Sequence, residues 1–263
     1  MTAPTPRRPP AAPPHTPRVV RVWRITRVLT HLAQAAVVAG LGYPLMTPAR
    51  RRLALQRWSA KLLRLLAANL TVHGTPPREG DTYLLAANHV SWLDIFVINA
   101  AAPTRFVAKS EIRGWPLIGW LCVKAETLFI ERDRRRDLAR LDDVIATALN
   151  AGAGMGVFLE GTTTDGHEVL PFHSSLLRPA QQAAANIVPV AIQYRRSDGS
   201  ICVEAAFDGD KTLLDTIRLM LTQHEIHTAV HFLPPVDGQG VHRKVLARQT
   251  REVIVRTLYP EKA

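Results

Sequence analysis

From residue 71 onward, short apolar runs alternate with stretches of helical periodicity. The apolar runs have the length and residue types of strands. Strands are expected at Thr82–Ala87, Arg105–Ala108, Thr127–Ile130, Met155–Leu159, Ile187–Tyr194, Ile201–Ala206 and Thr228–Leu233. Helices are expected at Trp92–Ala101, Trp115–Cys122, Arg136–Asn150, Ser175–Ala185, Leu213–Gln223 and Val241–Leu258. This alternation predicts an α/β domain over residues 71–263, with a mainly parallel sheet flanked by helices.

The first half of the preceding segment combines basic and apolar stretches. Arginines recur at every third position in residues 18–28, and residues 29–46 then contain no charged side chain. A charge-free stretch of this length is at the lower limit for a helix that spans a bilayer. It is also compatible with a re-entrant or surface-lying helix, and a buried helix of a soluble core is the alternative.

A second helix is expected from about Ala49 to Leu70. Arg57, Lys61 and Arg64 share one face of it, and the opposite face is apolar: Leu55, Trp58, Leu62, Leu65 and Leu66. Basic amphipathic helices with a tryptophan are typical of elements that lie in a membrane surface. The alternative is a helix packed on the domain with a solvated basic face. The charge-free neighbour favours the membrane, so residues 18–70 are expected to form a two-helix membrane-associating motif.

The positive charge of the chain is an N-terminal property. The formal net charge is +11, and the first 64 residues contain twelve Lys and Arg residues but no Asp or Glu. Residues 1–17 are rich in Pro, Ala, Thr and Arg and are expected to be disordered. Basic residues on both flanks of an apolar segment stay in the cytoplasm, which predicts the cytoplasmic face of the inner (cytoplasmic) membrane. A nucleic-acid partner is not expected, because the remainder of the chain is nearly neutral.

Two cysteines, Cys122 and Cys202, lie far apart in the sequence and lack the spacing of a metal or redox motif. Neither a disulfide framework nor a zinc site is expected, and a reducing compartment is the default.

The candidate chemistry begins with His89 and Asp94, which follow the apolar run at residues 83–87. Histidine takes up a proton near neutral pH, and a carboxylate within reach can fix its tautomer and stabilise the imidazolium ion. No Cys or Ser nucleophile is obviously paired with them, which suggests a base that acts directly on a substrate hydroxyl. A continuous helix would separate the two side chains by about 140°, so contact requires a break before Ser91.

A purely structural interpretation accounts for the same residues. Ser91 would cap a helix that begins there, and Asp94 would be the third helical residue in a variant of the capping box. His89 would then be a bystander in the loop. The two interpretations are compatible, because a helix that starts at Ser91 leaves His89 just outside it.

Four segments in order resemble the blocks of the glycerolipid acyltransferase family, which contains the bacterial 1-acylglycerol-3-phosphate acyltransferases. They are Asn88-His89-x-x-x-x-Asp94, Phe129-Ile130-Glu131-Arg132, Phe158-Leu159-Glu160-Gly161-Thr162 and Val188-Pro189-Val190-Ala191-Ile192. Lys109, the stretch at residues 114–119 and the stretch at residues 170–172 also resemble family segments. Four blocks in the right order, at strand ends, are far more specific than any one of them.

The resemblance implies transfer of a fatty acyl group from acyl-CoA or acyl carrier protein to the hydroxyl of a lysolipid. The first expected acceptor is 1-acylglycerol-3-phosphate, which gives phosphatidate. His89 would be the general base and Asp94 would orient it, with no acyl-enzyme. No metal ion or bound cofactor is implied, and the membrane lipid is an expected partner.

The resemblance also assigns substrate-binding roles. Arg132 would hold an acceptor phosphate, for which a guanidinium fork is suited, and Lys109 would support it. Glu160 would contact the acceptor. Backbone N–H groups near Gly161 and Thr162 would stabilise the tetrahedral oxyanion.

Four positions depart from the family pattern. Glu126 stands where the family usually has Gly, Leu159 where it has Pro, Thr163 where many members have Arg, and His173 where many have Lys. The last two departures remove positive charge from the expected headgroup site, so a less anionic acceptor such as a lyso-ornithine lipid is the alternative. A thioester or lipid hydrolase is the rival of another class, but Ser174 and Ser175 lie in no nucleophile-elbow motif.

Overall fold

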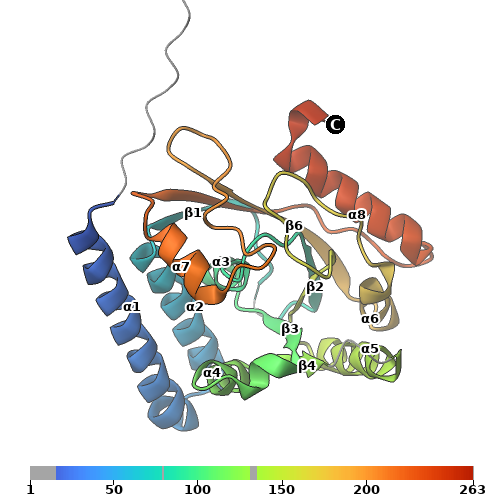
Figure 1. Ribbon diagram of the computed structural model, residues 1–263. Coiled ribbons are helices and arrows are strands. Elements are labelled where there is room, and N and C mark those ends of the chain that lie inside the picture. The colour runs from blue at the N-terminus through green and yellow to red at the C-terminus, as the bar shows by residue number, and fades with distance from the viewer. Residues whose placement is uncertain (1–15, 79, 131–134, 263) are drawn as a thin grey trace, which may run out of the picture.

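The computed structural model describes residues 16–78, 80–130 and 135–262. A seven-stranded sheet, with strand order β1-β7-β6-β2-β5-β3-β4, forms its centre (Figure 1). All neighbouring strands are parallel except β6 and β7, which are antiparallel. The strands are β1 (Ala68–Gly74), β2 (Tyr83–Ala87), β3 (Arg105–Lys109), β4 (Leu128–Ile130), β5 (Met155–Phe158), β6 (Asn186–Arg195) and β7 (Ile226–Phe232). The predicted mainly parallel sheet is confirmed.

Helices cover both faces of the sheet, as the prediction required (Figure 1). They are α1 (Arg18–Val37), α2 (Pro48–Leu65), α3 (Asp94–Ala101), α4 (Ile118–Lys124), α5 (Arg135–Asn150), α6 (Arg178–Gln182), α7 (Leu213–Met220) and α8 (Arg243–Leu258). Alternate residues of β2 enter two separate cores: Tyr83 and Leu85 pack with α2 and α3, whereas Leu84 and Ala86 pack with α5, α6 and α8. The alternation follows from the two-residue repeat of a strand. Because both faces are covered, β2 is buried throughout.

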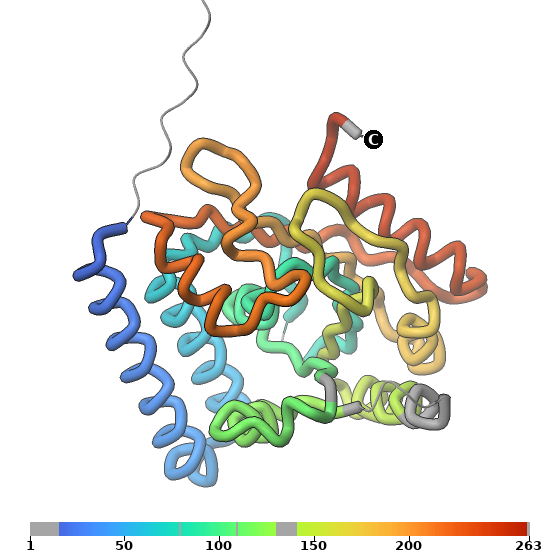
Figure 2. The backbone as a smooth tube through the Cα atoms, viewed as in Figure 1, coloured from blue at the N-terminus to red at the C-terminus, as the bar shows by residue number. Residues whose placement is uncertain are grey.

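The first two helices lie side by side (Figure 2). The first continues beyond Val37 through a π-helical turn to Gly42 and a 3-10 turn to Leu45. Residues Arg18–Leu45 are long and apolar enough to cross a bilayer, with a mean hydropathy of 1.3 over the best window. Only 22% of that window is buried, so most of this helix is available for contact with something outside the domain.

The second helix packs its apolar face on the domain. Leu62, Leu65 and Leu66 are buried in the core beside α3, and the basic face with Arg57 and Lys61 is exposed. The apolar face of α2 is thus covered by the domain. The large exposed apolar side chains in this region belong mainly to α1 and the turn after it: Val19, Val22, Trp23, Leu29, Val37, Leu41 and Leu45.

Two expected elements differ from the structure. The second helix ends at Leu65 instead of Leu70, and β1 follows, so that the expected boundary at residue 70 falls inside a strand of the sheet. Residues 201–206 form no strand, since only Ile201 makes an isolated bridge to Arg195.

Candidate active site

The loop between β2 and α3 brings the predicted pair together. His89 Nδ1 lies 2.8 Å from Asp94 Oδ2. The helix begins at Asp94 and not at Ser91, and the intervening residues are non-helical. The chain therefore has the non-helical break before Asp94 that contact between the side chains of His89 and Asp94 requires. Asp94 Oδ2 also accepts hydrogen bonds from the backbone N–H groups of Val90 (2.8 Å) and Ser91 (2.9 Å), so this carboxylate both caps the loop and holds the imidazole.

Asp94 is completely buried, and its second oxygen has its own donor. The hydroxyl of Tyr194, near the end of β6, donates to Asp94 Oδ1 over 2.6 Å. Burial, together with the adjacent carboxylate of Asp94, raises the pKa of Tyr194 well above its usual range, so the phenol remains a donor. Sequence reasoning missed Tyr194. Its one signal was its place in the predicted strand Ile187–Tyr194, near the strand end where parallel sheets form sites.

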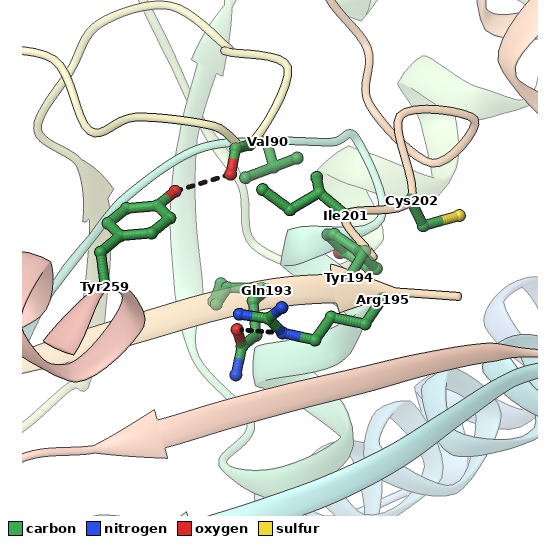
Figure 3. Close-up of a pocket in the computed structure, with 9 residues that line it drawn as sticks. Val90, Gln193, Tyr194, Arg195, Ile201, Cys202 and Tyr259 are labelled. Atoms are coloured by element: carbon green, nitrogen blue, oxygen red, sulfur yellow. Dashed lines mark hydrogen bonds between the residues drawn. The ribbon is translucent and has the colours of Figure 1, made fainter. Parts of the chain in front are cut away.

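A small cavity of about 10 Å³ lies beside Tyr194 (Figure 3). Its lining includes Val90, Tyr194 and Tyr259. The Tyr259 hydroxyl donates to the carbonyl of Gly166 over 2.6 Å, which attaches the C-terminal end of α8 to the loop after β5. Tyr194 thus forms part of the wall between this cavity and the carboxylate that holds His89.

Side chains at neighbouring strand ends fix the loop that carries His89. The amide of Asn88 makes two hydrogen bonds with the backbone of Ile192, at 2.8 and 3.0 Å, where β6 runs beyond β2. The carbonyl of His89 accepts from the N–H of Thr164 over 3.0 Å. Because the Asn88 amide and the His89 carbonyl are both hydrogen-bonded to backbone groups of other segments, the loop has little freedom to turn His89 away from Asp94.

Glu160 closes the loop from the end of β5. One carboxyl oxygen accepts from the backbone N–H of His89 (2.7 Å) and the other from that of Leu170 (2.6 Å). Glu160 is 3% exposed, and burial raises its pKa to about 7, although both backbone hydrogen bonds act in the opposite direction. In the structure, this carboxyl group positions the backbone of the candidate base. A contact with the acceptor headgroup stays a prediction.

The turn after Glu160 offers one of the two expected oxyanion donors. The N–H of Gly161 donates to the carbonyl of Phe158 over 3.2 Å and is therefore already engaged. Within the part of the chain that the structure describes, the N–H of Thr162 donates to no acceptor. Gly161 has φ +71°, and a Cβ there would lie 3.0 Å from the ring of His173, so the turn requires glycine.

One ring face of His89 is covered and its outer nitrogen is available. The imidazole stacks on Phe158 with centroids 3.8 Å apart, and Phe158 in turn stacks on Phe106. The His89 side chain is 20% exposed, and Nε2 has no hydrogen-bond partner among the described residues. Neither Ser174 nor Ser175 hydrogen-bonds to it within the same residues, so the pairing required by the hydrolase interpretation is not present there.

The remaining predicted site residues are only partly placed. The backbone of Lys109 ends β3, the strand next to β5. Arg132 lies outside the described residues. In the described ranges, no group of three or more His, Cys, Asp or Glu side chains is close enough to hold a metal ion.

Comparison with known proteins identifies the family. The acyltransferase family model matches residues 69–193. The lyso-ornithine lipid O-acyltransferase of Pseudomonas aeruginosa is 39% identical over 214 residues, which cover 81% of each chain. The chain belongs to the acyltransferase family. The 1-acyl-sn-glycerol-3-phosphate acyltransferase of Neisseria meningitidis is 36% identical over 82% of this chain and 84% of that protein.

A solved structure supports the same fold. The 1-acyl-sn-glycerophosphate acyltransferase from Thermotoga maritima superposes with a TM-score of 0.67 over 92% of this chain and 98% of its own, at 22% identity. The family model and the sequence relatives confirm the predicted family and enzyme class, and the chain is an acyltransferase of lysolipids.

Proposed function

We propose that this acyltransferase uses His89 as a general base to transfer a fatty acyl group from a thioester donor to the hydroxyl of a lysolipid. The observation that carries the proposal is the contact between His89 Nδ1 and the buried carboxylate of Asp94. It fixes the tautomer in which Nδ1 carries the proton, so that Nε2 is the nitrogen that accepts the next one. The donor is acyl-CoA or acyl carrier protein.

The chemistry proceeds without an acyl-enzyme. As the lysolipid oxygen attacks the thioester carbonyl, its proton moves to His89 Nε2 and the imidazolium is stabilised by Asp94. The Thr162 N–H donates to the oxyanion of the tetrahedral intermediate. The C–S bond then breaks, and the thiolate takes the proton from His89 to leave as a thiol. The ester product and the neutral imidazole remain.

Lyso-ornithine lipid is the acceptor that the observations favour, with lysophosphatidate second. Thr163 and His173 replace the basic residues of many family members. The Thr163 hydroxyl donates to the carbonyl of Phe207, so this position supplies no charge and no spare donor for a phosphate. The relatives with the lyso-ornithine name include two that are 39% identical, against 36% for the Neisseria proteins. The presence of Arg132, to which the family resemblance assigns phosphate binding, favours lysophosphatidate instead.

The enzyme is proposed to work at the cytoplasmic face of the inner membrane. The exposed apolar residues of α1 and the turn after it form a hydrophobic surface of the kind that marks contact with a membrane or a protein partner. The basic residues that flank this helix are those that the positive-inside rule retains in the cytoplasm. Both substrates that carry acyl chains would be delivered at that surface.

The test measures labelled ester formation by purified protein in detergent, with acyl-CoA or acyl carrier protein as donor and a panel of lysolipids. His89→Ala is expected to lose at least about 100-fold in rate, the low end of the contribution of a general base. His224→Ala is the matched control, because the side chain of His224 is exposed and only its backbone carbonyl is used.

Three outcomes decide between the candidates. Full transfer by His89→Ala excludes His89 as the base. Release of thiol without ester formation, with every lysolipid tested, favours the hydrolase. A higher kcat/KM for lysophosphatidate than for lyso-ornithine lipid reverses the order of the two acceptors.

A further inference from the structure

A groove of about 160 Å³ lies between α1 and α2, formed by residues that take no part in the acyltransfer site. Five of its six lining residues have polar or charged side chains: Arg27, Thr30, His31 and Gln34 from α1 and Lys61 from α2, beside Leu65. The two helices run side by side along its length (Figure 1). A groove of this size has room for a phosphate group together with part of the molecule that carries it.

The floor of the groove is a fixed structure. His31 is 3% exposed and stacks on Trp58 with ring centroids 4.8 Å apart. Each ring also bonds to the other residue's backbone: His31 Nε2 to the Trp58 carbonyl at 3.0 Å, and Trp58 Nε1 to the His31 carbonyl at 3.2 Å. His31 Nδ1 is buried, so the stacked pair supports the groove without offering it a free ring nitrogen.

Two cations on the groove wall lack acidic partners. Arg27 and Lys61 form no ion pair with any described residue, and no acidic residue precedes Glu79 in the sequence. Arg27 places its guanidinium carbon 4.3 Å from the centroid of the Trp23 ring, which leaves the N–H edge free. Lys61 Nζ makes one long hydrogen bond, 3.3 Å, to Gln34 Oε1, and an ammonium group has three donors. The wall therefore has unused capacity for an anion.

The groove opens beside part of the apolar surface of α1. Trp23, 55% exposed, contacts the guanidinium group of Arg27 on the groove wall. Tryptophan side chains favour the headgroup level of a bilayer, so contact of Trp23 with the membrane, as the proposed function requires, brings the groove to that level. We propose that this groove binds the phosphate of an anionic phospholipid headgroup and so anchors the enzyme at a fixed orientation on the membrane. The proposal rests on the membrane location in the proposed function, but not on its chemistry.

The experiment compares two charge-matched double variants. R27Q/K61Q removes both groove cations, whereas R57Q/R64Q removes two exposed cations of α2 that do not line the groove. Co-sedimentation measures binding of each full-length protein to vesicles of phosphatidylcholine alone or with phosphatidylglycerol. Non-specific attraction to the anionic surface predicts equal losses, because each basic residue near the surface contributes about 1 kcal/mol. A phosphate site predicts that R27Q/K61Q loses about tenfold more affinity than the control.

A soluble probe separates lipid headgroups from free phosphate. Calorimetric titration with inorganic phosphate, in the absence of vesicles, is expected to show at most millimolar affinity. Micromolar affinity for inorganic phosphate, without a preference for anionic vesicles, would assign the groove to a soluble anion and overturn the lipid. Equal losses in the two double variants would overturn the site itself.

The acyltransfer assay serves as the folding control. R27Q/K61Q should keep wild-type activity in neutral detergent micelles, since neither residue belongs to the acyltransfer site. Vesicle binding needs no turnover, so an enzyme that fails to acylate any lysolipid still reports on the groove. Conversely, wild-type protein that binds neutral and anionic vesicles equally overturns the groove proposal and leaves the acyltransfer proposal intact.

Discussion

Replacement of Tyr194 by phenylalanine isolates one hydrogen bond of the active site. The substitution removes only the hydroxyl that donates to Asp94 Oδ1 over 2.6 Å, a length typical of a charge-assisted bond. Among the described residues, no other donor reaches that oxygen, whereas Oδ2 keeps three. A buried carboxylate oxygen is then left without a partner, and the carboxylate loses the contact that fixes its rotation.

The magnitude follows from the charge on Asp94. A hydrogen bond to a charged group contributes about 1.5–3 kcal/mol, and this range is the expected loss in unfolding free energy. At about 2–4 °C per kcal/mol for a domain of this size, Tm should fall by roughly 3–12 °C. If the full amount is also lost in the transition state, kcat falls about 10- to 100-fold. KM should not change, because Tyr194 donates to Asp94 and lies behind it, away from the substrate.

Tyr83→Phe is the matched control. The hydroxyl of Tyr83 is also buried, but it bonds to the neutral side chain of Thr104 over 3.3 Å at the opposite end of β2. Its removal should cost about 0.5–1.5 kcal/mol in stability and nothing in kcat. Thermal unfolding and steady-state kinetics on both variants provide the comparison. If Tyr194→Phe loses stability while kcat stays within twofold of wild type, Tyr194 is a structural residue and does not position the base.

Three further predictions test the neighbouring residues. The folded-state pKa of Glu160 is about 7, above its ordinary value of 4.5, so on raising the pH the carboxyl group of the unfolded chain loses its proton first. The unfolding free energy should therefore fall by roughly 3 kcal/mol between pH 4.5 and 7. Denaturant titrations at both pH values should show this dependence in the wild type and its absence in Glu160→Gln. Gly161→Ala adds a methyl group 3.0 Å from the ring of His173 at positive φ, so its activity should fall more than that of Gly209→Ala, where φ is also positive but nothing lies within 4 Å. Asp94→Asn removes the charge that stabilises the imidazolium, and a loss of about 10³- to 10⁴-fold in kcat is expected in the ester-formation assay.

The strands of the sheet were predictable because burial on both faces makes them continuous apolar runs. The first strand was missed for a local reason. The chain leaves α2 through Ala67, which has φ +57°, a conformation that alanine rarely adopts and that sequence patterns assign to glycine or asparagine. With Leu65, Leu66 and Leu70 continuing an apolar pattern across this point, nothing in the sequence marks the end of the helix.

The false strand at residues 201–206 has a different cause. Its composition favours a strand, and Cys202, Ala205 and Ala206 are indeed buried in the core. However, one edge of β6 is paired with β7 as far as Arg195, and the Asn88 side chain occupies the other edge at Ile192. Only the last positions of β6 remain for pairing, which limits the segment to a single bridge. The pairing of β7 and the Asn88 side chain with the edges of β6 depends on residues far away in the sequence, so the local sequence pattern of residues 201–206 cannot reveal it.

The structural and catalytic interpretations of Asp94 turned out to describe one carboxylate, and this explains why the sequence could predict it. The same oxygen that accepts the N–H groups of Val90 and Ser91 also accepts the imidazole of His89, so a helix-start pattern and a base-plus-acid pattern require the same residue. The second oxygen depends on Tyr194, one hundred residues away, and no spacing rule could connect the two. Local hydrogen bonds therefore place the acid, whereas the sheet brings the distant donor that fixes its orientation. A residue of the second kind becomes visible only after the order of strands is known.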